Sequence, residues 1–134
     1  MNVSRSVVPL FAVLAVASSA WAHHSFAMFD LDKEVTLEGA VKDLQWANPH
    51  VWLEVDVADD NGGTTKWSFE MGTTGMLTRA GWKSSTLKVG DRVKVVCNPL
   101  RSGDPSGRLV TVTLPDGRVL GPGGPAPLPP KPAA

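Results

Sequence analysis

Residues 51–71, VWLEVDVADDNGGTTKWSFEM, contain the clearest structural pattern in the sequence. In its first half, valine and leucine alternate with polar or aromatic residues, which is the period of a strand with one buried face. Asn61-Gly62 follows, a pair that tolerates the positive φ of a tight reversal. The second half alternates again and puts Trp67 and Phe69 on one face. We therefore predict two antiparallel strands joined by a hairpin.

Strand patterns of the same kind flank this hairpin. Residues 35–46 alternate before it, and Gly39 inside that run predicts a bend or a bulge. Two more strands are expected after it, over residues 92–97 and 109–114. In between, a pair of threonines can cap a short helix that ends at Gly81.

Five strands with a helix between the third and the fourth follow the order of an oligonucleotide/oligosaccharide-binding (OB) barrel. We therefore expect an all-β domain over residues 33–120, a five-stranded OB-like barrel with one short helix. An open β-sandwich is the competing architecture, because its strands alternate in the same way. The 134 residues allow one domain, and 43% hydrophobic against 19% charged residues is typical of a globular protein.

Residues 1–22 have the features of a secretory signal peptide. Arg5 supplies a positive charge, an apolar run follows, and Ala20-Trp21-Ala22 gives the small-x-small pattern that signal peptidase accepts. A membrane anchor is the competing interpretation, but the apolar run is short and no stop-transfer charges follow it. We expect a periplasmic or secreted protein with no membrane span after cleavage, whose mature chain starts at His23 with a short segment, residues 23–32.

The C-terminal residues, the charge balance and the single cysteine restrict the classes of protein to which this chain can belong. Residues 121–134 are rich in Pro and Gly, which predicts a disordered tail. The 13 Lys+Arg residues equal the 13 Asp+Glu residues, so the basic excess of a nucleic-acid-binding protein is missing. A single cysteine excludes an internal disulfide, and the inward position of Cys97 in its strand predicts a buried, inert thiol.

Several short motifs occur together in this chain. They include HHSF at residues 23–26, WANPHVWL at residues 46–53, and LPDGR at residues 114–118. In combination they resemble the small exported bacterial proteins grouped as domain of unknown function 6152, over roughly residues 23–120. The resemblance implies a small exported protein. It implies no catalytic residue, because the activity of the family is not established.

The histidines form the first candidate site, a copper site. A chain that starts at His23 offers an α-amine beside an imidazole, and together these can chelate a metal. His50 is the expected third ligand, with His24 as a local substitute, and such a nitrogen-rich set, called a histidine brace, favours Cu(II). Thioether ligands suited to Cu(I) are available from three methionines, Met28, Met71 and Met76. The alternatives are a frayed polar terminus, a histidine that bonds its own turn, and methionines that fill the core.

The outward face of the central hairpin is the second candidate site. His50, Trp52 and Glu54 have the same parity and lie on this face of one strand, and Lys66 and Glu70 lie on the same face of the next. In an OB-like barrel these two strands form the usual ligand platform, so the face can bind an envelope protein or a glycan. The alternative is that the N-terminal segment covers Trp52 and leaves no site.

Catalytic patterns are missing from the sequence. It contains no nucleophile elbow, no calcium loop and no Gly-rich phosphate cradle. We therefore expect a non-enzymatic, exported binding protein with copper as its leading ligand. The alternative function is an envelope interaction module that uses the Trp52 face.

Overall fold

The computed structural model describes residues 27–122 and 124–125. Its elements in chain order are β1 (Val35–Gln45), β2 (Trp52–Ala58), β3 (Thr64–Glu70), α2 (Thr74–Arg79), β4 (Arg92–Pro99), β5 (Ser106–Thr113), β6 (Val119–Gly121) and β7 (Gly124–Pro125). The one short helix between β3 and β4 is where the sequence predicts it.

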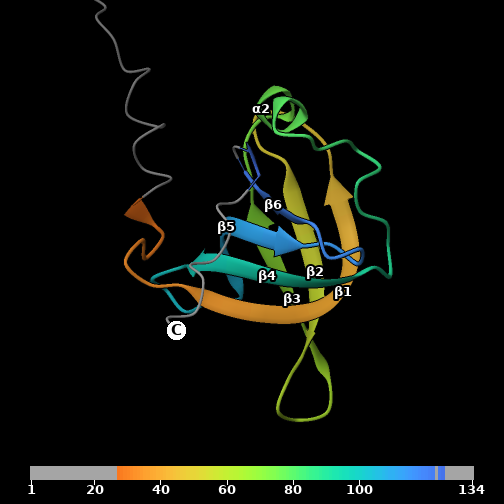
Figure 1. The fold of residues 1–134 in the computed structure, drawn as a ribbon. Coiled ribbons are helices and arrows are strands. Elements are labelled where there is room, and N and C mark those ends of the chain that lie inside the picture. The colour runs from red at the N-terminus through yellow and green to blue at the C-terminus, as the bar shows by residue number, and fades with distance from the viewer. Residues whose placement is uncertain (1–26, 123, 126–134) are drawn as a thin grey trace, which may run out of the picture.

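The strands form a closed barrel (Figure 1). β1 pairs with β4 through its first half and with β2 through its second half, both antiparallel. β2 pairs with β3, and β4 pairs with β5. A parallel pairing between β3 and β5 closes the ring. This is the connectivity of an OB barrel, so the five-stranded barrel is confirmed and the open sandwich is excluded.

Gly39 allows β1 to serve both halves of the barrel. It is paired on one side with Val57 of β2 and on the other with Val93 of β4. A Cβ atom at this position would collide with the carbonyl oxygen of Asp56 and lie 2.7 Å from Val55 Cγ1. The close approach of two strands therefore requires glycine here, and a register shift just beyond it bends β1 further.

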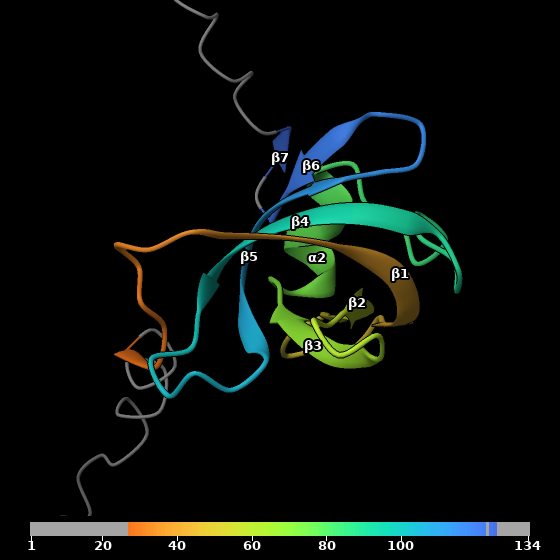
Figure 2. The same ribbon diagram turned by 90° about the horizontal axis from the view of Figure 1, so that it is seen from below.

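Alternating side chains of the strands fill the barrel. Its most deeply buried strand residues include Leu53, Val55, Phe69, Val95, Leu109 and Val112. α2 lies across one end of the barrel, and Figure 2 shows it within the ring of strands. The side chain of Leu77 on α2 is fully buried, and so is that of Trp82, whose amide donates to the Leu77 carbonyl at 2.9 Å. The helix therefore closes one end of the barrel and completes its hydrophobic core.

β4 and β5 extend further than the sequence predicts. β4 continues through Asn98 to Pro99, and β5 begins three residues early at Ser106. The side chain of Asn98 is buried, and its amide donates to the carbonyl of Lys33 at 2.9 Å. Because this bond satisfies the buried polar side chain, the strand does not have to end there.

The final strands are attached to the barrel beside α2, through Trp82. The indole Nε1 of Trp82 donates to the carbonyl of Gly121 at 3.0 Å, across 39 residues of sequence. Gly121 and Gly124-Pro125, which were expected to belong to the tail, are in β6 and β7. Residues 126–134 and the predicted signal peptide, residues 1–22, lie outside the described part of the chain. Within that part, no helix is long and apolar enough to cross a bilayer.

Candidate metal and ligand site

A pocket of about 280 Å³ lies where the end of β3, the start of β5 and the start of α2 meet. Its walls include the apolar side chains of Phe29, Met71 and Leu109 and the polar side chains of His50, Glu70 and Arg108. This volume is close to the lower end of the range for small-ligand sites. The pocket is therefore suited to an ion or a small molecule.

His50 is fixed at the edge of this pocket by the backbone next to it. The amide of Val51 donates to the Gly72 carbonyl at 3.0 Å, and the amide of Met71 donates to the Val51 carbonyl at 2.9 Å. These bonds continue the β2–β3 ladder past the ends of both strands. His50 therefore lies beside Met71 at a set position, with 43% of its side chain exposed.

The two neighbours of His50 Nδ1 are both acceptors. Nδ1 lies 3.1 Å from the carbonyl oxygen of Met71 and 3.3 Å from Oε1 of Glu70. A carbonyl and a carboxylate can only accept, so Nδ1 is assigned the proton. The lone pair of the neutral ring is then on Nε2. His50 therefore has a nitrogen that can bind a metal.

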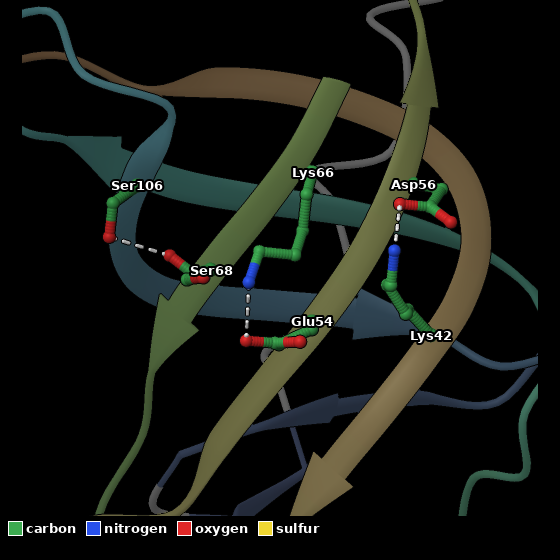
Figure 3. Close-up of polar contacts among 6 residues, drawn as sticks. All are labelled: Lys42, Glu54, Asp56, Lys66, Ser68 and Ser106. Carbon is green, nitrogen blue, oxygen red and sulfur yellow. Dashed lines mark hydrogen bonds and ion pairs between the residues drawn. The ribbon is translucent and has the colours of Figure 1, made fainter. Parts of the chain in front are cut away.

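The residues of the second candidate site do not form a single cluster in the structure. Lys66 Nζ donates to Glu54 Oε1 at 3.1 Å, so these two side chains pair with each other (Figure 3). Glu70 instead turns toward His50, at the pocket. Trp52 lies opposite Glu70 in the β2–β3 register and is half-buried.

Further polar contacts hold this outer face together. Lys42 Nζ lies 3.7 Å from Asp56 Oδ1, which adds a β1–β2 ion pair to the Glu54–Lys66 pair. Ser106 Oγ donates to the Ser68 carbonyl at 2.8 Å where β5 meets β3 (Figure 3). The lysine side chains of both pairs are about half exposed, and surface ion pairs contribute about 0–1 kcal/mol each, so a ligand could displace them at small cost.

His23 and His24 lie outside the described residues, which begin at residue 27. Phe29 is buried, with 3% of its surface exposed, and it forms a wall of the pocket. The carbonyl of Met28 accepts from the amide of Arg101 at 2.9 Å, on the loop between β4 and β5. This bond attaches the N-terminal segment beside the pocket that contains His50.

Other metal-binding groupings are absent from the described residues. No three His, Cys, Asp or Glu side chains lie close enough there to hold an ion. Cys97 is fully buried, as expected, and burial raises the pKa of its thiol to about 11. This thiol therefore stays protonated at neutral pH and is a poor nucleophile or ligand.

Phe29 and Arg108 line the pocket, but the sequence patterns assigned neither residue to a binding site. Arg108 lies opposite Glu70 in the parallel β3–β5 register, and that pairing joins distant segments. Arg108 precedes the strand expected over residues 109–114, and its proximity to Glu70 depends on how the barrel closes. Phe29 is in a short segment without a periodic pattern, so its burial had no local signal.

Comparison with known proteins identifies a family. A family model described as "Family of unknown function (DUF6152)" matches residues 12–109, more than half of the chain. No curated protein and no solved structure matches the chain. The match agrees with the resemblance seen in the motifs.

Proposed function

Because the chain belongs to the DUF6152 family, whose description names no activity, we propose a function from the pocket: an exported, non-enzymatic protein that binds copper. His50 Nε2 supplies one ligand. The α-amine and imidazole of His23, exposed by signal-peptide cleavage, supply two more, with His24 as a local substitute. The compartment is the periplasm or the cell exterior.

The hydrogen bonding of His50 carries this proposal. Metal-binding histidines almost always donate their other ring N–H to a carboxylate or a backbone carbonyl, which fixes the tautomer and the ring orientation. Nδ1 of His50 has both kinds of acceptor, Glu70 at 3.3 Å and the Met71 carbonyl at 3.1 Å. These contacts thus orient the ring in the absence of an ion, and the lone pair of Nε2 is available to bind one.

The position of Phe29 supports the participation of the N-terminus. Phe29 and His50 are walls of one pocket, and His23 lies six positions before Phe29. An extended chain spans about 3.3–3.6 Å per residue, so His23 has a reach of about 20 Å from Phe29. This reach is ample for a return to His50.

The chemistry of these ligands supports copper. Two imidazoles and an amine form a nitrogen-rich set, and Cu(II) binds such sets more tightly than the other divalent first-row ions. The amine has an ordinary pKa of about 7.7–8.0, so a metal can displace its proton near neutral pH. Carriage or storage of the ion needs only these ligands.

The test begins with the intact mass of the form recovered from the periplasm, which shows whether the chain starts at His23. Cu(II) is then titrated into this form and into one with a single extra residue before His23. We expect the extension to weaken Cu(II) binding at least 100-fold, because it converts the amine into an amide. Equal affinities in both forms would exclude the brace.

The envelope interaction module is the second candidate function. The half-buried Trp52, flanked by the Glu54–Lys66 ion pair, gives an aromatic surface with polar neighbours on which a sugar ring can stack. Co-sedimentation with purified peptidoglycan, with and without Trp52→Ala, tests this function. Binding that is lost in Trp52→Ala would support the module, and binding that is unchanged in this variant would exclude the Trp52 face as its site.

A further inference from the structure

We propose that the pocket has a second copper-binding set, for Cu(I), made of the Met76 thioether and His50 Nε2, with the Met71 thioether as a further ligand. The inference rests on the proposed function for the choice of copper. It needs no ligand from residues 23–26. Its failure is therefore separable from the failure of the N-terminal brace.

Met76 is a methionine that the core does not use. It is 47% exposed on α2, and it lines the pocket. A Cβ atom built on Gly72 would lie 3.7 Å from Met76 Cε, so the methyl end of Met76 lies over Gly72. Gly72 directly follows Met71, whose carbonyl holds His50. The thioether and the imidazole therefore both line this pocket, and both lie close to the segment Met71-Gly72.

The elements that carry His50 and Met76 are tied together. Asn48, two residues before His50, accepts at Oδ1 from both the amide and the hydroxyl of Thr74, each at 3.0 Å. Thr73 caps the same turn of α2 by accepting from the amide of Met76 at 3.2 Å. These bonds fix the start of α2 against the loop that presents the imidazole.

The ligand types select the oxidation state. Soft thioethers favour Cu(I), whereas the amine and imidazoles of the brace favour Cu(II). A thioether has no proton to lose, so its binding needs no deprotonation. The carboxylate of Glu70 faces His50 at the same pocket, which Arg108 also lines. One pocket can thus hold copper in either oxidation state, with His50 shared by both ligand sets.

The chain offers a matched control for this proposal. Met28 is as exposed as Met76, at 53% against 47%, but it is not among the residues that line the pocket. Replacement of either by leucine keeps the size of the side chain and removes the sulfur. A difference between Met76→Leu and Met28→Leu therefore reports on the pocket rather than on methionine content.

The experiment uses the full mature chain with one extra residue before His23, so that the brace is blocked. Cu(I) is titrated anaerobically in competition with a Cu(I) chelator, and Ag(I) is used as a redox-inert probe of the methionine methyl signals in NMR spectra. We expect binding of one Cu(I) per chain. We further expect Ag(I) to shift the Met76 signal, a loss of at least tenfold in Cu(I) affinity in Met76→Leu, and none in Met28→Leu.

Two results would overturn the inference. One is equal Cu(I) affinity in Met76→Leu and Met28→Leu. The other is loss of Cu(I) binding on blocking the N-terminus alone, since the brace would then be the site in both oxidation states. If the extra residue leaves the Cu(II) affinity unchanged while Met76→Leu weakens Cu(I) binding, the brace is rejected and the second ligand set is kept.

Discussion

The Nδ1 atom of His50 lies 3.1 Å from the carbonyl oxygen of Met71. This contact joins the loop before β2 to the segment after β3, at the wall of the pocket. It directs one ring nitrogen to the backbone and leaves the other for an ion. The copper site proposed for this protein depends on that division of the ring.

The carboxylate of Glu70 is expected to strengthen copper binding through His50. Glu70→Gln keeps an acceptor near Nδ1 but removes the negative charge, so Cu(II) affinity should fall about 10-fold to 100-fold, as is usual for such outer-shell partners. Isothermal titration at fixed pH measures the change. Glu54→Gln is the control, because Glu54 is equally buried, 17% exposed against 15%, but pairs with Lys66. Equal losses in the two variants would contradict the assignment.

Gly39 is expected to be indispensable to the barrel. In Gly39→Ala the new methyl group would collide with the Asp56 backbone, so the free energy of unfolding should fall by about 1–3 kcal/mol or the chain should fail to fold. Urea unfolding measures the loss. Gly75→Ala on the exposed side of α2 should do the reverse, with a gain of about 0.5–1 kcal/mol, because a Cβ atom there would meet only Arg79 Nη1, at an ordinary contact distance of 3.8 Å, on a helical backbone. An unchanged stability of Gly39→Ala would refute the account of the β1 bend.

Alternation along residues 51–71 was enough to predict the central hairpin. The inward positions Leu53, Val55 and Phe69 are fully buried because a strand turns every second side chain to the same face. Cys97 was predictable for the same reason. Such patterns are local, so a single strand contains the information.

The site could be predicted only in part, because it depends on contacts between distant segments. Alternation put His50 and Glu70 on one face of the hairpin, but their contact was not predicted, because His50 was expected to bind a metal and Glu70 to belong to the Trp52 site. The position of Phe29 and the β3–β5 closure depend on pairings across 38 residues or more, as in the Ser106–Ser68 bond. Neither strand of a parallel pair contains a sequence pattern that identifies its partner strand.

The indole of Trp82 is expected to hold the C-terminal strands on the barrel. Trp82→Phe keeps an aromatic ring but removes the Nε1 donor, which leaves the Gly121 carbonyl without that partner. The free energy of unfolding should fall by about 1–3 kcal/mol. Hydrogen exchange should accelerate over residues 119–121. Trp67→Phe, which preserves a ring stacked on Phe69, should leave that exchange unchanged. Slow exchange of β6 in Trp82→Phe would show that other contacts hold it.

The buried thiol of Cys97 is expected to destabilise the fold at high pH. Its pKa is raised from 9.0 to about 11 in the folded chain, so the unfolded chain ionises first. Below about pH 9 the protonated thiol makes its full contribution to the free energy of unfolding. As pH rises from 9 to 11, this contribution is lost at up to about 1.4 kcal/mol per pH unit. Chemical unfolding across this pH range measures the slope. Cys97→Ala should lack this part of the pH dependence, and identical slopes would disprove the assignment.

Pulsed electron paramagnetic resonance of the Cu(II)-loaded mature protein tests the central claim most directly, because the remote nitrogen of each copper-bound imidazole gives its own modulation. We predict two bound imidazoles, from His23 and His50, of which His50→Ala loses one together with most of the Cu(II) affinity. A spectrum and an affinity that do not change in His50→Ala would contradict the account.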